Sequence, residues 1–139
     1  MKKILFVCTG NTCRSPMAQA VFNNLCDSEY FSSDSCGLYA DGVSMISDNA
    51  KAALKNQGID FDHVSKPITK ELCDNADFII GITNRHAGAL MVAFPGHEKK
   101  VFSFPVDIPD PYGMSLEVYQ ECLEKITEGV KVIIHELEK

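Results

Sequence analysis

Short apolar runs alternate along the chain with longer segments that have helical periodicity. The runs cover residues 4–7, 77–82 and 101–104, and a run of this kind is typical of a strand that is buried on both faces. Residues 30–39 form a further candidate strand, a Ser-rich stretch that contains Ser35-Cys36-Gly37. The pattern therefore predicts four short strands.

Segments with apolar residues at helical spacing separate these strands. Ser15 is the expected N-cap of the first helix, with Pro16 at its first helical position, and Asn84 is the expected cap of a later helix. The last segment carries an amphipathic stripe that could cover one face of a sheet. Helices are predicted over residues 15–25, 47–57, 84–93 and 115–137, and a short one from residue 69.

Strands that alternate with helices predict an α/β fold in three layers. The four strands should form a parallel sheet with right-handed crossovers and helices on both faces, and the strand at 77–82 should lie next to the first. With 139 residues, the chain is expected to form a single domain over residues 1–139. Ligands bind such sheets at the carboxyl ends of the strands, so the loop after the first strand is the expected site.

Composition and charge narrow the classes of function. The fractions of hydrophobic and charged residues, 45% and 23%, are ordinary for a globular protein. The formal net charge of −6 argues against nucleic acid or an anionic membrane as a partner, because both attract basic surfaces. Lys2 and Lys3 precede an apolar run that is too short for a signal peptide or a membrane span, so a cytoplasmic protein is expected.

The cysteines and histidines lack the spacing of a metal site, and no cofactor or metal is expected. Lone histidines are more often surface residues than ligands, so His86, His97 and His135 are assigned no role. Four of the six cysteines lie outside the first loop and are expected to be structural thiols: Cys26, Cys36, Cys73 and Cys122.

The loop after the first strand carries the residue types that phosphate chemistry needs. Backbone N–H groups at the start of a helix, together with the helix dipole, form a seat for a tetrahedral oxyanion. Cys8 is a candidate nucleophile, since a thiol beside a guanidinium at a helix N-terminus can have a pKa of roughly 3.5–7.5. Arg14 can bind two phosphoryl oxygens with its planar fork. Gly10 is expected to need backbone angles that a Cβ forbids, Asn11 to tolerate left-handed geometry, and Ser15 to donate to the thiolate.

Residues 8–18, with the sequence CTGNTCRSPMA, resemble the phosphate-binding loop of the low-molecular-weight protein tyrosine phosphatase family. The likeness covers nearly the whole chain and includes a second signature, Asp110-Pro111-Tyr112. It implies a hydrolase that works through a phosphocysteine intermediate on phosphorylated protein substrates and that takes phosphate or vanadate as a ligand. Cys8 and Arg14 match catalytic positions. The residues that match phosphate-binding or substrate-binding positions are Thr9, Gly10, Asn11, Thr12, Cys13, Ser15 and Tyr112.

The loop at residues 107–113 supplies a candidate acid. Pro109 and Pro111 stiffen this loop, so Asp110 could be held at a fixed angle over the phosphate seat. A carboxyl group is needed there because the departing atom must be protonated and the attacking water must later be deprotonated. The resemblance assigns Asp110 as general acid and base and Tyr112 as a wall of the cleft, and Asp107 is a second candidate carboxylate.

The family also braces its loop asparagine through two serines and a histidine. Its Ser-Ala-Gly pattern at the second strand is Ser-Cys-Gly here, so the bracing serine is kept and the alanine is not. The positions that match the braced asparagine and its supports are Asn11, Ser15, Ser35 and His63.

Two departures from the tyrosine-specific pattern concern the substrate. Thr12 stands where most of the family has a bulky aliphatic residue, and Gly113 stands where a second aromatic residue is common. Both weaken an apolar slot for a phenyl ring, whereas the Thr12 hydroxyl and the Asp110 carboxylate can accept hydrogen bonds from a guanidinium. Both departures resemble the bacterial protein arginine phosphatase branch of the family. If the chain is of that kind, Thr12 is also expected to orient the attacking water. A phosphotyrosine phosphatase of the same family is the alternative.

Other classes fit the sequence less well. A thioredoxin-coupled arsenate reductase needs further resolving cysteines after the third strand, and residues 81–94 contain none. A phosphocysteine carrier domain has no use for Arg14 or Asp110, because it must protect its phosphocysteine from hydrolysis. A catalytically inactive phosphate-binding adaptor would need no nucleophile, arginine and acid together. Cys8 and Cys13 share one loop. Two interpretations are equally compatible with this: a redox-sensitive pair that can form a disulfide, or a Cys13 that only packs in the core.

Overall fold

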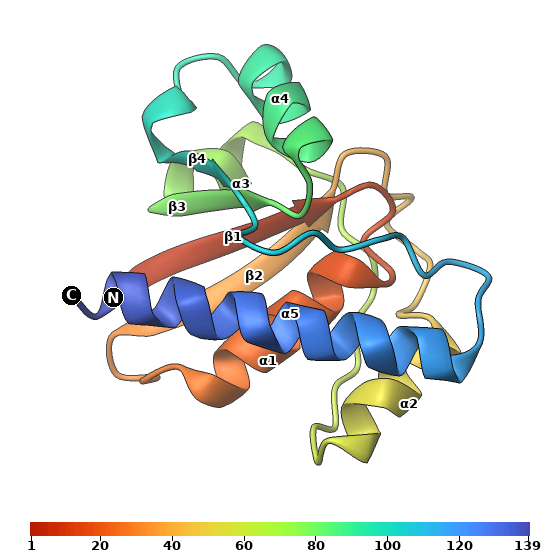
Figure 1. The fold of residues 1–139 in the computed structure, drawn as a ribbon. Helices are drawn as coiled ribbons and strands as arrows, with labels where there is room; N and C mark the ends of the chain where they lie inside the picture. The colour runs from red at the N-terminus through yellow and green to blue at the C-terminus, as the bar shows by residue number, and fades with distance from the viewer.

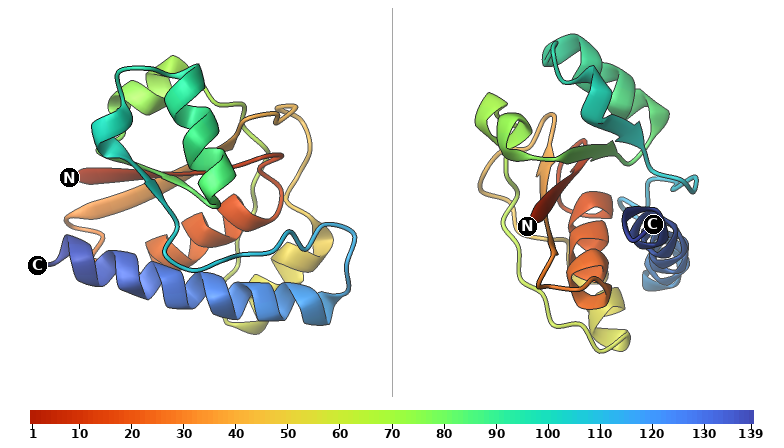
Figure 2. Two further views of the ribbon diagram at one scale, coloured as in Figure 1. Left: turned by 45° about the horizontal axis from the view of Figure 1, so that its top comes forward. Right: turned by 90° about the vertical axis from the view of Figure 1, so that its left-hand side faces the viewer.

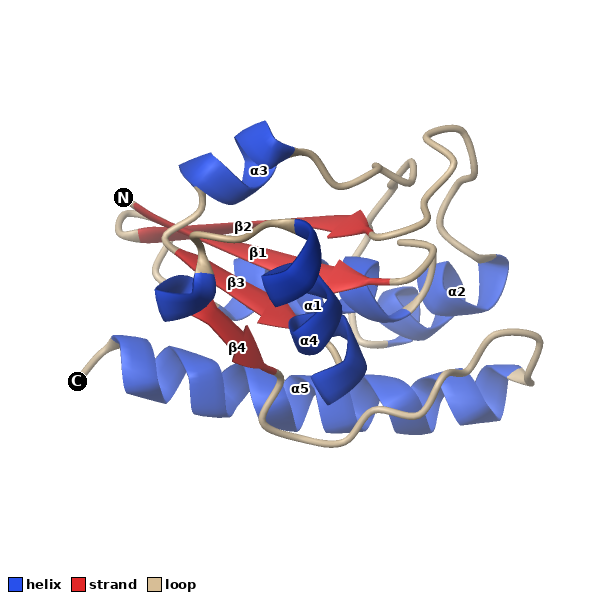
Figure 3. Cartoon of the chain, turned by 90° about the horizontal axis from the view of Figure 1, so that it is seen from above, coloured by secondary structure: helices blue, strands red, loops and turns tan.

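A sheet of four parallel strands, in the order β2-β1-β3-β4, organises the computed structural model, which describes residues 1–139. β1 (Lys2–Cys8) pairs with β2 (Phe31–Gly37) on one side and with β3 (Phe78–Gly81) on the other, and β4 (Val101–Ser103) pairs with β3. All four predicted strands are present, and β3 lies beside β1 as expected. The strands run toward the same edge of the sheet (Figure 3).

Helices cover both faces of the sheet, which confirms the predicted three-layer α/β fold. One face is covered by α1, α2 and α5, and the opposite face by α3 and α4 (Figures 1 and 2). A short 3₁₀ helix, η1 (Glu98–Lys100), precedes β4 and was not predicted. The α-helices are α1 (Arg14–Leu25), α2 (Asp48–Asn56), α3 (Lys70–Asn75), α4 (Asn84–Ala93) and α5 (Leu116–Leu137).

The apolar run of β1 is buried because its side chains enter two separate cores. Ile4 and Phe6 belong to the larger core, between the sheet and the helices α1, α2 and α5. Leu5 and Val7 belong to the smaller core, between the sheet and the helices α3 and α4. Residues 4–7 are all apolar because helices cover both faces of the strand there, as the sequence pattern indicated.

The predicted start of the first helix is wrong by two residues. α1 begins at Arg14, with Cys13 as its N-cap residue, so Ser15 lies inside the first turn and does not cap the helix. Pro16 is tolerated as the third helical residue because backbone N–H groups in a first turn have no helical acceptor. The early start frees the Ser15 hydroxyl for contacts with the loop that precedes the helix.

The cap of α4 is also displaced from its predicted position. Thr83, and not Asn84, is the N-cap residue, and its hydroxyl accepts a hydrogen bond from the backbone N–H of His86. The His86 ring in turn accepts from the backbone N–H of Thr83, which completes a capping box. The expected start of the second helix fits better, because Ser47 caps α2.

No helix of this fold combines the length and the apolar character that crossing a membrane requires.

Candidate active site

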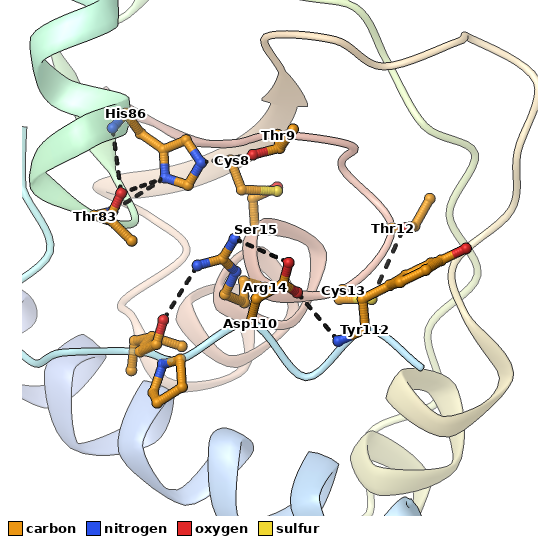
Figure 4. Close-up of polar contacts among 12 residues, drawn as sticks. Cys8, Thr9, Thr12, Cys13, Arg14, Ser15, Thr83, His86, Asp110 and Tyr112 are labelled. Carbon is orange, nitrogen blue, oxygen red and sulfur yellow. Dashed lines mark hydrogen bonds and ion pairs between the residues drawn. The ribbon is translucent and has the colours of Figure 1, made fainter. Parts of the chain in front are cut away.

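The predicted phosphate seat is a small pocket at the carboxyl edge of the sheet, of about 210 Å³. Two segments that are far apart in the sequence form it (Figure 4). One runs from the last residue of β1 into the first turn of α1 (residues 8–15, the Cys8 loop), and the other follows β4 (residues 105–114, the Asp110 loop). The pocket is lined by Cys8, Thr9, Gly10, Asn11, Thr12, Cys13, Arg14, Asp110 and Tyr112.

Cys8 ends β1 at the base of this pocket and is only 3% exposed. Its Sγ lies 2.8 Å from Ser15 Oγ. Burial raises the pKa of the Cys8 thiol above its ordinary value, whereas the Ser15 hydroxyl, the backbone N–H groups of Ser15 and Asn11, and the Arg14 guanidinium lower it. The sequence suggested a lowered pKa, and the correction is physical: the strand that positions the thiol also removes it from water, and this desolvation outweighs the four opposing groups.

Asn11 holds the Cys8 loop in shape from a fully buried position. It is the one residue other than glycine with a positive φ, 59°, as its expected tolerance of left-handed geometry requires. Its side-chain Nδ2 donates to Ser15 Oγ at 2.8 Å and to Ser35 Oγ at 3.0 Å. Its Oδ1 lies 2.7 Å from His63 Nε2 and accepts from the backbone N–H of Lys66 at 2.9 Å. The structure thus brings together the four residues that the resemblance matched to this brace.

The expectation for Gly10 is wrong. Gly10 does not have a left-handed φ, and a Cβ built on it would meet only Thr12 Oγ1, at 3.8 Å. Crowding occurs instead at Gly37, the last residue of β2, where a Cβ would lie 2.4 Å from the carbonyl oxygen of Thr9. The next residues support the loop from the same side, because the N–H groups of Leu38 and Tyr39 donate to the carbonyl oxygens of Cys8 and Thr9.

Arg14 joins the two loops. Its side chain is buried, its Nη1 donates to the carbonyl oxygen of Ile108 at 3.2 Å, and its Nη2 lies 3.8 Å from Asp110 Oδ2. The Asp110 side chain is 59% exposed, and its Oδ1 accepts from the backbone N–H of Tyr112 at 3.1 Å. Asp107 is exposed and does not line the pocket. Of the two candidate carboxylates, only Asp110 therefore lies at the site.

Thr12 and Cys13 form another part of the wall. Thr12 is half-buried, and its hydroxyl lies 3.8 Å from Cys13 Sγ. Cys13 Sγ donates to Ser47 Oγ at 3.5 Å and lies 3.3 Å from the hydroxyl of Tyr119 on α5. Burial, with the contact to Cys13 as a second cause, raises the pKa of Tyr119 to about 12. Both loop cysteines are free thiols, and a disulfide between them stays a prediction.

His86 reaches the site although the sequence assigned it no role. It is only 6% exposed, and its Nε2 lies 2.9 Å from the hydroxyl of Thr9 in the Cys8 loop. Burial, with Arg14 as the second cause, lowers the pKa of His86 to about 4. A signal was present in the sequence, because Thr83 and His86 have the three-residue spacing of a capping box directly after the third strand.

Known proteins resemble this chain over nearly its whole length. Residues 3–139 match the family described as low molecular weight phosphotyrosine protein phosphatase. The chain belongs to this family. It is 33% identical to a protein-arginine-phosphatase of Bacillus subtilis over 145 residues, which cover 98% of this chain and 97% of the relative. It is 37% identical to a protein-arginine-phosphatase of Geobacillus stearothermophilus over 131 residues, which cover 89% of this chain and 88% of the relative.

A solved structure extends this phosphatase-family likeness to three dimensions. It is a Cys-to-Ser mutant of YwlE arginine phosphatase that carries a phosphorylated active-site serine. The two chains superpose with a TM-score of 0.91 at 32% identity, and the match covers 99% of this chain and 96% of the solved one. The order of strands and helices described above is therefore that of a low-molecular-weight phosphatase.

Proposed function

We propose that this chain is a cysteine-dependent protein phosphatase that hydrolyses phosphoarginine through a phosphocysteine intermediate. One observation carries the proposal: the Cys8 thiol, the Arg14 guanidinium and the Asp110 carboxylate line a single small pocket. These groups can act as nucleophile, oxyanion ligand and proton carrier, which is the set that the reaction needs.

In the first step, the Cys8 thiolate attacks the phosphorus atom of the substrate. An S–P bond forms as the P–N bond to the guanidine breaks, and protonated Asp110 gives its proton to the departing nitrogen. Arg14 and the backbone N–H groups of the Cys8 loop stabilise the charge on the phosphoryl oxygens. Ser15 supports the attack because its hydroxyl, 2.8 Å from Cys8 Sγ, lowers the pKa of the thiol.

In the second step, water hydrolyses the phosphocysteine. The Asp110 carboxylate removes a proton from the water as its oxygen attacks phosphorus, the S–P bond breaks, and the electron pair returns to Cys8 as thiolate. Phosphate then leaves the pocket, and Asp110 holds the proton for the next turnover. The related solved structure with a phosphorylated active-site serine in place of a cysteine supports a covalent intermediate.

The lining of the pocket favours a guanidinium over a phenyl ring. Thr12 and Asp110 both line it, and both present oxygens that can accept hydrogen bonds from the N–H groups of arginine. Tyr112 supplies one aromatic wall but is 74% exposed, and Gly113 supplies no second one. The two relatives named protein-arginine-phosphatases support this specificity, whereas the description of the family favours phosphotyrosine.

The setting of the reaction is part of the proposal. Residues 1–139 act as one catalytic domain on phosphorylated proteins, and this is supported by one sheet whose two faces carry all the helices. The cytoplasm is the expected compartment, because six free thiols suit a reducing environment. The reaction as written requires no metal, so EDTA should leave activity unchanged.

A substrate panel tests the proposal. The purified protein should release phosphate from phosphoarginine with a higher kcat/KM than from phosphotyrosine. Cys8→Ser should abolish turnover and retain phosphate or vanadate binding, whereas Cys26→Ser, which alters a thiol outside the pocket, should change neither. A wild-type protein that prefers phosphotyrosine would overturn the specificity alone, and a Cys8→Ser protein that turns over at the wild-type rate would overturn the mechanism.

A further inference from the structure

We infer that His86 is a positioning residue for phosphate binding, which orients the hydroxyl of Thr9 so that its proton points into the phosphate seat. The inference rests on the proposed function, since it concerns the same pocket. His86 is a buried histidine on α4, and it takes no part in the two chemical steps. Figure 4 shows His86 and Thr9 next to each other beside Cys8.

The hydrogen bonds of His86 select one tautomer of its ring. Nδ1 lies 3.2 Å from the backbone nitrogen of Thr83, whose N–H can only donate, so Nδ1 must be an acceptor. The Thr83 hydroxyl lies 2.9 Å from the same Nδ1. A neutral imidazole that accepts at Nδ1 carries its proton on Nε2. His86 Nε2–H therefore donates to Thr9 Oγ1 across the 2.9 Å contact.

This contact leaves Thr9 with an available proton. Its Oγ1 accepts from His86, and no group of the protein accepts a hydrogen bond from its O–H. Thr9 is exposed and lines the pocket together with Arg14. A phosphoryl oxygen in this pocket is an acceptor only, so the Thr9 hydroxyl would complement it as an additional donor.

The surroundings of His86 favour its neutral form. The ring lies at the N-terminus of α4, where the helix dipole disfavours a cation. Arg14 and Arg85 also disfavour a second proton, Asp110 favours it, and burial is the largest influence; together they lower the pKa of His86 to about 4. Nδ1 therefore stays an acceptor, and the single ring proton stays on Nε2, throughout the neutral pH range.

Capping of α4 does not account for the whole arrangement. The capping box uses only Nδ1 and the backbone N–H of His86, and Nε2 is free to face any neighbour. An asparagine at this position could place an oxygen near Nδ1 and keep the cap, but it is too short to reach Thr9. A glutamine could place an amide N–H near Nε2. These two substitutions separate a role in the cap from a role toward Thr9.

The experiment measures the affinity for inorganic phosphate by isothermal titration calorimetry, which needs no turnover. Thr9→Val and His86→Asn should each weaken binding about tenfold, the scale of one hydrogen bond to a charged group. Thr9→Ser and His86→Gln should restore most of this loss. The double variant Thr9→Val/His86→Asn should bind no more weakly than Thr9→Val alone, because both changes remove the same donor. His97→Asn, a histidine outside the pocket, serves as the matched control and should bind like the wild type.

Each result decides the inference. Additive losses in the double variant would overturn it, as would unchanged affinity in Thr9→Val or His86→Asn. A folded His86→Gln protein that binds as weakly as His86→Asn would also overturn it, because a donor restored near Nε2 would then have no effect. Unchanged affinity in His86→Asn together with a loss in His86→Gln would reduce His86 to a cap residue. A wild-type protein that binds phosphate but hydrolyses no phosphorylated amino acid would overturn the proposed function and leave the inference about Thr9 standing.

Discussion

The two loops that form the pocket are built in opposite ways. The Cys8 loop is mostly buried, and at Asn11 alone four neighbouring groups make hydrogen bonds to one side chain. The Asp110 loop is mostly exposed and is held at few points, among them the contact of Arg14 with Ile108 and the bond from Asn49 Nδ2 to the carbonyl oxygen of Met114. A buried network with all its polar groups satisfied is rigid, whereas an exposed loop tolerates change.

This difference suggests a division of labour. The phosphoryl group is common to all substrates of such an enzyme, and a rigid seat binds it without reorganisation in the transition state. The leaving group differs between substrates, and the residues that meet it are Asp110, Tyr112 and the half-buried Thr12. Substitutions in the Asp110 loop should therefore change rates and selectivity at little cost in stability, and substitutions in the Cys8 loop should change both. The first three of the four predictions below test this division.

The largest effect is expected for Asp110→Ala. Loss of the general acid should lower kcat on phosphoarginine or on poor phenol leaving groups by about 10²–10⁴-fold, and much less on p-nitrophenyl phosphate, whose leaving group needs no proton. Because the side chain is exposed, the free energy of unfolding should change by no more than about 0.5 kcal/mol. Asp107→Ala is the matched control in the same loop. Equal losses on good and poor leaving groups would remove Asp110 from this role.

Asn11→Ala should have the reverse profile. It removes a fully buried side chain and leaves the hydroxyls of Ser15 and Ser35, the His63 ring and the N–H of Lys66 without a shared partner. Such losses should lower the free energy of unfolding by roughly 2–4 kcal/mol, and activity should fall on all substrates alike. Urea denaturation and a substrate panel measure the two effects. A stable variant with altered selectivity would contradict the division of labour.

Local patterns in the sequence predicted most of this fold because the sheet has a hydrophobic core on each face. A strand buried on both faces must be apolar throughout, so residues 4–7 are recognisable without any partner. The helix starts were misplaced because a local cap signal cannot show that Ser15 is required by Cys8 and Asn11. At Asn84 the neighbouring Thr83 proved the better cap, through its reciprocal bonds with His86.

The residues of the site likewise fall into those that a local pattern predicted and those that only the fold brings together. That Cys8, Arg14 and Ser15 lie together was predictable because they belong to one short segment. The bracing of Asn11 by Ser35 and His63 came only from the family resemblance, since these residues lie 24 and 52 positions away. The bond from the backbone N–H of Lys66 was not predicted. His86 was missed because its task depends on Thr9, a neighbour in space and not in sequence. The raised pKa of Cys8 was missed because the sequence of the loop does not show how deeply this thiol is buried.

Thr12→Ile tests selectivity at the residue of the Cys8 loop that is expected to meet the leaving group. The branched side chain fills the space beside Cys13 and removes the hydroxyl that could accept from a guanidinium. The ratio of kcat/KM for phosphoarginine to that for phosphotyrosine should fall about tenfold or more, since one hydrogen bond to a charged group is lost. Thr12→Ser, which keeps the hydroxyl, should hold the ratio near the wild-type value. An unchanged ratio in Thr12→Ile would assign selectivity to the Asp110 loop alone.

The smallest effect is a pH dependence of stability that comes from His86, the α4 residue in contact with Thr9 of the Cys8 loop. In the folded protein, burial lowers the pKa of His86 to about 4, whereas in the unfolded chain it lies near 6.5. Between these values the unfolded state binds more protons, so the contribution of His86 to stability is complete above pH 6.5 and is lost as the pH falls toward 4. The wild type should lose about 1 kcal/mol from this group between pH 7 and pH 5.5.

A comparison of the wild type with His86→Asn isolates this effect. His63, whose pKa burial also lowers, acts in the same direction but is present in both proteins. Urea denaturation at several pH values should therefore show a shallower pH dependence for His86→Asn, whatever its absolute stability. Equal slopes would mean that the folded protein accepts a proton on His86 as readily as the unfolded chain does.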